Sequence, residues 1–140
     1  MKNHLRRLLV TIGLSAVLGS SLLNAQVYGK IAVADIPFSF RIADRVLPPG
    51  NYTVTAHSNG LTQLWNTDTH QSMAFLAGSE ESNKQPDPKL VFTCYGDRYF
   101  LSQIWFGSGD RGRVLAKSRL EKEIAGSTKM PGALASIKIK

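Results

Sequence analysis

The stretch over residues 90–107, LVFTCYGDRYFLSQIWFG, is the densest run of aromatic and branched apolar residues after the amino-terminal segment. Two apolar runs, residues 90–95 and residues 98–106, flank the pair Gly96 and Asp97. Glycine accepts the positive φ that the first central position of a type II′ turn requires, so the stretch is predicted to form a β-hairpin. Both faces of this hairpin are apolar, which means that other parts of the chain must cover each of them.

The turn also predicts the register of the hairpin, because the two strands pair outward from a two-residue loop and their side chains alternate between faces. The predicted cross-strand pairs are Cys94 with Tyr99, Phe92 with Leu101, and Leu90 with Gln103. One predicted face carries Leu90, Phe92, Cys94, Tyr99, Leu101 and Trp105. The opposite face carries Val91, Thr93, Tyr95, Arg98, Phe100, Ser102, Ile104 and Phe106.

The amino-terminal segment has the organisation of a secretory signal peptide. Basic residues within positions 1–7 precede an apolar run over residues 8–18, and Ala25 offers a cleavage point, with Gly29 as the alternative. This apolar run is shorter than the about 20 residues that are needed to span a bilayer, so we do not interpret it as a membrane anchor. We expect no transmembrane segment after processing. The expected destination is periplasmic or extracellular. We therefore predict a signal peptide over residues 1–25 and a single β-rich domain over residues 26–140.

Composition limits the functions of this domain. Cleavage removes three of the 17 basic residues and leaves 14 against 10 acidic ones, a mild excess that is typical of solubility rather than of a nucleic-acid-binding face. We therefore expect no nucleic acid partner. Cys94 is the only cysteine, so no internal disulfide can form and packing must stabilise the fold.

Further strands follow from period-two alternation and turn signals. Residues 36–42 are predicted to form a half-buried strand, and residues 44–50 to turn the chain through Pro49 and Gly50. Other strands are expected near residues 52–56, 61–66, 73–77, 113–117 and 135–140, the last at a sheet edge. Surface loops or linkers are expected over residues 67–71, 78–88, 107–112 and 127–134.

The loop at Asn59 and Gly60 permits two registers. A two-residue loop places Val54 opposite Trp65, whereas a three-residue loop over residues 58–60 places Val54 opposite Leu64 and turns Trp65 to the other face. We prefer the three-residue loop, because it gathers the apolar side chains on one face and leaves Trp65 pointing outward.

One short helix is predicted near the carboxyl terminus. Ser118 and Glu121 have capping-box spacing, Leu120 and Ile124 share one helical face, and Gly126 is placed to end the helix. With this helix over one end of the sheet, the chain is predicted to be an all-β protein: a small antiparallel β-sandwich or barrel of about seven to eight strands with one short C-terminal helix.

The segments IPFSFRIADRVLPPGNYTV, KLVFTCYGDRYFLSQIW and GRVLAKSRLEKEIA together resemble a family of short exported β-rich proteins of acidobacterial type, over residues 34–125. That family has no assigned activity, so the resemblance implies export and a single β-rich domain but no functional residue. The element L-P-x-G-x-Y-x-V at residues 47–54 is also similar to turns in many extracellular β-sandwich modules.

Motifs that would bind a cofactor or a metal ion are not convincing. Gly107, Gly109 and Gly112 match G-x-G-x-x-G, but a dinucleotide site needs a helix beginning at these glycines, and a strand is expected there instead. The mature chain contains two histidines, His57 and His70, without the spacing of a zinc site. We therefore expect no cofactor and no metal site, and we identify no catalytic constellation.

Aromatic residues are the best candidates for a binding site. We predict ligand binding at Trp65, His57, Tyr95 and Arg98, because aromatic rings stack on sugars or apolar ligands and Arg98 adds a cation at the hairpin tip. The basic residues of the segment 111–122 are interpreted as a solvated face, with contact to anionic envelope polymers as the alternative.

The predicted function is that of a non-enzymatic exported β-sandwich protein, either structural or binding an envelope glycan, lipid or protein partner. The alternative is a small secreted hydrolase whose site assembles only in the folded chain. A third hypothesis is a subunit that binds its partner by strand addition at the edge formed by residues 135–140.

Overall fold

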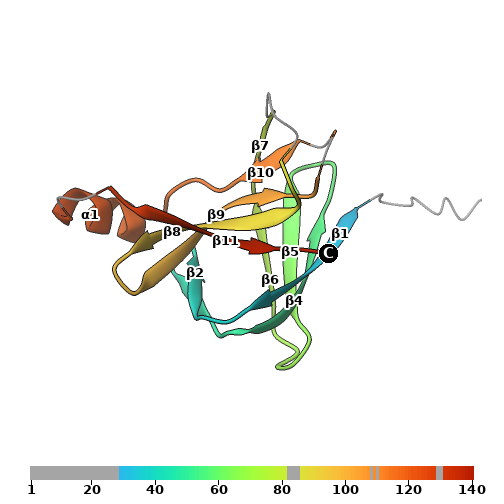
Figure 1. Cartoon of the computed structure of the whole chain (residues 1–140), viewed down its shortest axis with the longest axis horizontal. Helices are drawn as coiled ribbons and strands as arrows, with labels where there is room; N and C mark the ends of the chain where they lie inside the picture. Colours follow the sequence, from blue (N-terminus) through green and yellow to red (C-terminus); the bar gives the residue numbers. More distant parts are fainter. Residues whose placement is uncertain (1–28, 82–85, 108, 110, 129–130) are drawn as a thin grey trace, which may run out of the picture.

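Two β-sheets face each other across the hydrophobic core in the computed structural model (Figure 1). The structure describes residues 29–81, 86–107, 109, 111–128 and 131–140, so the predicted signal peptide lies outside the described residues. Within them the chain forms eleven strands, more than the seven to eight predicted. Residues 45–47 and 78–80 form strands where a turn and a loop were predicted, and the strand predicted over residues 36–42 is divided between a strand over residues 30–36 and another over residues 40–42. The all-β fold class with one short C-terminal helix is confirmed, and the sheets do not close into a barrel.

The first sheet, sheet A, is antiparallel throughout. Its strand order is β1 (Lys30–Ile36), β4 (Gly50–Ala56), β5 (Leu61–Asn66) and β6 (Ser72–Leu76). Val54 pairs with Leu64 and Thr53 pairs with Trp65, which confirms the register expected from a three-residue loop. Gly60 closes that loop with a φ of +87°, a conformation that glycine adopts without strain.

The second sheet, sheet B, contains the central hairpin. Its strand order is β11 (Ala133–Lys138), β8 (Lys89–Tyr95), β9 (Arg98–Trp105), β10 (Gly112–Val114) and β7 (Gly78–Glu80). β11 is an edge strand as predicted, although it begins at Ala133, inside the predicted linker. The predicted loop over residues 78–88 is wrong at its start, where β7 pairs with β10, and its residues 82–85 lie outside the described part.

The chain passes from sheet A to sheet B where a single strand was predicted over residues 36–42. β1 ends at Ile36, and β2 (Phe40–Ile42) pairs with β3 (Arg45–Leu47) and, in parallel, with β9. The predicted strand was wrong because Pro37 has no N–H to continue the ladder. The predicted turn over residues 44–50 was also wrong in extent, since β3 lies within it and the chain reverses at Ala43 instead, with a φ of +51°.

The central hairpin has the predicted turn, but its register changes halfway. Gly96 has a φ of +66°, and the pairs of Cys94 with Tyr99 and of Phe92 with Leu101 are as predicted. Beyond them Val91 pairs with Gln103, which leaves Ser102 as an extra residue in a β-bulge. Leu90 consequently pairs with Ile104 rather than with Gln103.

The bulge exchanges two large side chains between the faces of the hairpin. Ile104, predicted on the outer face, belongs to the core, and Trp105, predicted on the core face, is buried on the outer face instead. The core between the sheets is made of side chains from both layers: Ala32, Ala34, Ile36, Tyr52, Val54 and Leu64 from sheet A, and Phe40, Ile42, Leu47, Leu90, Phe92, Leu101 and Ile104 from sheet B.

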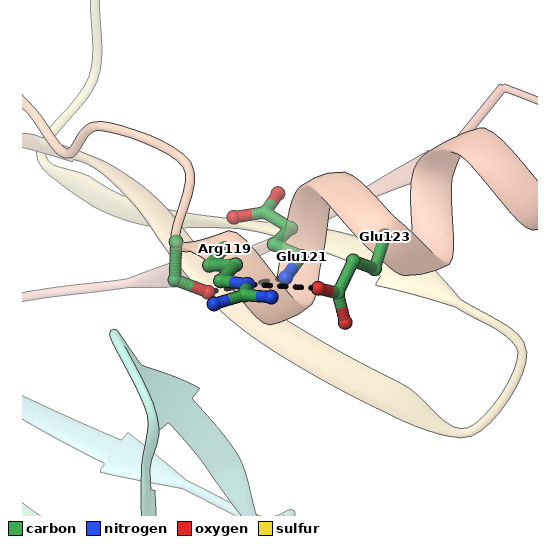
Figure 2. A network of polar contacts seen from close by, with 4 residues as sticks. Arg119, Glu121 and Glu123 are labelled. Carbon is green, nitrogen blue, oxygen red and sulfur yellow. Dashed lines mark hydrogen bonds and ion pairs between the residues drawn. The ribbon is translucent and has the colours of Figure 1, made fainter.

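The helix α1 (Arg119–Ser127) lies beside the hairpin end of sheet B, away from the strands of sheet A (Figure 1). The backbone N–H of Glu121 donates a hydrogen bond to Ser118 Oγ over 3.1 Å, so the predicted cap is confirmed. Its reciprocal half does not form: the Glu121 carboxyl group turns away from the exposed pair of Arg119 and Glu123 (Figure 2) and contacts Tyr95. Gly126 lies inside the helix rather than after it.

Candidate functional site

The outer face of sheet A carries an exposed indole in its interior. We call this surface the Trp65 face; its members are the outward side chains of the four strands, including Ile31, Val33, Thr53, Thr55, Gln63, Trp65, Ser72 and Leu76. Trp65 is 40% exposed although it belongs to β5, which has a paired strand on each side. Successive side chains of a strand point to opposite faces of the sheet. The neighbours of Trp65, Leu64 and Asn66, are buried on the core side, so Trp65 points outward.

The surroundings of Trp65 combine apolar and hydroxyl groups. One cross-strand row reads Val33, Thr53, Trp65 and Ser72. The His70 ring lies beside the indole with 5.9 Å between ring centroids and a 46° tilt. An indole flanked by two hydroxyl-bearing side chains can stack on a flat apolar ring face and hydrogen bond to that ring's substituents.

His57 lies on the same sheet face as Trp65, directly after the end of β4 and four residues beyond Thr53, which is the cross-strand neighbour of Trp65. The His57 side chain is half-buried, and its Nδ1 is buried without a hydrogen-bond partner. Its backbone oxygen accepts a hydrogen bond of 2.9 Å from Arg113 Nη2. The predicted site residues Trp65 and His57 therefore share a surface, although the outward pair of Thr55 and Gln63 lies between them.

Tyr95 and Arg98, the other two predicted site residues, pair with each other at the tip of the β8–β9 hairpin in sheet B. The structure does not bring them together with Trp65 and His57. Arg98 is exposed, whereas Tyr95 is only 7% exposed. Trp105 is equally buried and donates its indole N–H to Gln103 Oε1 over 3.0 Å. Trp65 is thus the tryptophan that is available to a ligand.

Tyr95 belongs to a polar cluster beneath α1 that the sequence did not predict. Lys117 Nζ donates to the Tyr95 hydroxyl over 3.2 Å, and this hydroxyl donates to Glu121 Oε1 over 3.5 Å. Burial raises the pKa of the Glu121 carboxyl, and the nearby Lys117 charge and the Tyr95 hydrogen bond oppose the rise. The spacing from Ser118 indicated a capping role for Glu121 and gave no sign of its contact with β8. We interpret the cluster as the attachment of α1 to the hairpin.

A pocket of about 600 Å³ opens where the β4–β5 loop, the β6–β7 crossing and β10 meet. Its wall includes Lys30, Gly60, Ser79, Phe106, Arg111 and Arg113. Within the described part of the chain, this wall contains three cationic side chains and no carboxylate. The sequence indicated two of the three cations through the basic run near residue 111. It could not place Lys30 beside them, because that contact depends on how the two sheets meet.

The described residues contain no group of three or more His, Cys, Asp or Glu side chains placed to hold a metal ion. In the same part of the chain, no hydrogen bond joins the His57 or His70 side chain to a carboxylate, the arrangement that would favour the hydrolase alternative. No helix among the residues that the structure describes has the length and apolar character needed to cross a membrane. Comparisons with protein-family models, curated proteins and solved structures give no match to this chain.

Proposed function

We propose that this protein is a non-enzymatic exported binding module that holds an envelope glycan on its Trp65 face. The observation that carries the proposal is the 40% exposure of Trp65 in the interior of a four-stranded sheet. A large aromatic side chain on a folded domain gains stability from burial, so an exposed one on a regular sheet face marks a surface available for contact. Export is inferred from the leader residues and from the resemblance of residues 34–125 to exported proteins.

The chemistry of the face favours a sugar over a lipid surface. The row through Trp65 places Thr53 on one side of the indole and Ser72 on the other, so hydroxyl groups lie beside the ring that would stack on the sugar. A surface for anionic lipids gains affinity from clustered lysine and arginine side chains. No outward position of the Trp65 face, from Ile31 in β1 to Leu76 in β6, is a lysine or an arginine.

Intrinsic fluorescence tests the proposal directly, because the chain has two tryptophans and only Trp65 is exposed. In a Trp105→Phe variant, Trp65 is the single indole. We expect its emission to shift or quench as soluble peptidoglycan fragments or envelope polysaccharides are added.

Trp65→Ala should weaken that binding by at least about two- to tenfold, since an aromatic contact is worth about 0.5–1.5 kcal/mol beyond the area that it buries. Binding of this variant is measured by isothermal titration calorimetry. The matched control is Leu134→Ala, which removes a 73% exposed apolar side chain from sheet B. Equal affinity of the Trp65→Ala variant and the parent protein would remove the Trp65 face from the binding site.

A further inference from the structure

The pocket at the end of the sandwich, which we call the basic pocket, is a second candidate site, separate from the Trp65 face. Its volume of about 600 Å³ lies within the range of small-molecule sites, about 300–1,000 Å³. Trp65 is not part of its wall. The pocket is formed by three segments that are distant in sequence, β1 at Lys30, the loop at Gly60 and β10 at Arg113, so it is a product of the fold rather than of one loop.

Arg113 is held in place at this pocket by a neutral group. Its Nη2 donates a 2.9 Å hydrogen bond to the backbone oxygen of His57, and the structure shows no ion pair for its guanidinium among the described residues. The carbonyl fixes the orientation of the guanidinium without cancelling its charge. Such a preorganised cation retains most of its donors for an incoming anion.

Arg111 already binds a carboxylate. Its Nη2 lies 2.5 Å from Glu81 Oε1, and the two side chains are 67% and 70% exposed. An ion pair as exposed as this contributes about 0–1 kcal/mol, so a ligand anion can replace Glu81 at little cost. Glu81 is then a weak internal competitor for the position that a ligand anion would take.

The rest of the wall suits a sugar-sized body more than an inorganic ion alone. Phe106 provides an apolar surface, and the hydroxyls of Ser58 and Ser79 and the amide of Asn59 provide neutral hydrogen-bonding groups. We propose that the basic pocket binds a sugar-sized ligand through a phosphate or carboxylate substituent, which Arg111 and Arg113 hold. This inference does not depend on glycan binding at the Trp65 face, because the two surfaces share neither tryptophan nor arginine residues.

The test compares three ligands of similar size by isothermal titration calorimetry with the processed protein: glucose 6-phosphate, glucuronate and glucose. We expect at least one of the two anions to bind about fivefold or more tightly than glucose, which corresponds to one charge contact screened by water. Binding should weaken as the salt concentration is raised. Preference for glucose 6-phosphate assigns a phosphate-bearing ligand, and preference for glucuronate assigns a carboxylate-bearing one.

Charge variants place the binding in the pocket. Arg111→Gln should weaken anion binding by about fivefold, whereas Glu81→Gln should strengthen it by removing the internal competitor. Arg45→Gln removes the same charge from β3, which is not part of the pocket wall, and should change the affinity by less than about twofold. All three positions are exposed, and thermal melts establish that each variant remains folded.

Two results would overturn the inference. In one, neither anion binds more tightly than glucose. In the other, Arg45→Gln weakens binding as much as Arg111→Gln does, which would mean that the protein's overall charge attracts the anion and the pocket does not.

Discussion

Truncation of Phe92 to alanine is the sharpest test of what stabilises this fold. Phe92 is fully buried in the core and packs edge to face against two other rings. The distances between ring centroids are 5.1 Å to Phe38 and 5.5 Å to Phe40. Those two residues lie at the crossing from sheet A to sheet B, so the Phe92 ring supports the connection between the layers as well as its own strand.

The expected loss follows from the cavity that the substitution leaves. A buried phenylalanine replaced by alanine costs about 3–5 kcal/mol, compared with about 5–15 kcal/mol for the unfolding of a typical domain. For a domain of about 100 residues each kcal/mol shifts the midpoint of thermal unfolding by about 4 °C or more, so the Phe92→Ala midpoint should fall by about 12–20 °C. Because the chain has a single cysteine, no disulfide can mask this loss.

Thermal and urea unfolding of the processed protein, followed by circular dichroism, measures the change. Trp65→Ala is the control, because it removes a larger ring from a half-exposed position and should cost about 1 kcal/mol or less. If Phe92→Ala does not fold, Phe92→Leu keeps most of the volume and loses only the ring contacts, about 0.5–1.5 kcal/mol each. Equal losses for the alanine variants at positions 92 and 65 would refute the proposed core.

Three further predictions concern α1 and the outer face of sheet B. Burial raises the pKa of the Glu121 carboxyl, so the stability that this group contributes is complete below its ordinary pKa of 4.5 and is lost as the pH rises through the raised value. The free energy of unfolding of Glu121→Gln, relative to that of wild type, should therefore be highest at pH 7 and should decline as the pH is lowered. Urea unfolding at several pH values measures this difference, and a difference independent of pH would contradict the prediction. Gly112→Ala should lower stability by about 1–3 kcal/mol, because its Cβ would lie 2.5 Å from the Trp105 ring. Gly126→Ala, in α1 with no atom within 4 Å of its added Cβ, should instead stabilise by about 0.4–1 kcal/mol, and thermal melts that rank the two glycine variants the other way would be inconsistent with the packing described.

Registers set by a nearby loop were predictable. The three residues of the β4–β5 loop place Val54 opposite Leu64 and turn Trp65 outward, as the sequence indicated. The first pairs of the β8–β9 hairpin follow from Gly96 in the same way. In each case the conformation of a few adjacent residues decides the pairing, so the information is local.

The bulge at Ser102 was not predictable, because its partners are remote in sequence. The Ser102 hydroxyl donates to the Val91 oxygen over 3.0 Å, and the Ser102 oxygen accepts from the Leu115 N–H over 2.9 Å. These bonds hold the extra residue out of the ladder, and the shift places Ile104 rather than Trp105 in the core. Alternation alone could not anticipate a change of register that depends on a third segment of chain.

The placement of the predicted binding residues was likewise predictable where local contacts determine it and not where distant segments do. The exposure of Trp65 followed from local register, so the sequence was sufficient to place this predicted binding residue on an open face. The burial of Tyr95 depends on α1 folding back over the hairpin, and its separation from Trp65 depends on the two residues belonging to different sheets.

The sequence by itself determined the all-β class, the two hairpins, the helix cap at Ser118 and the outward direction of Trp65, because turn chemistry and side-chain periodicity act over a few residues. Only the tertiary structure decided where the chain changes sheet, how Ile104 and Trp105 are distributed, and that Lys30, Arg111 and Arg113 line one pocket. These features depend on hydrogen bonds and packing between segments tens of residues apart. Each segment alone allows several partners, and the partner is chosen by which arrangement buries the common core.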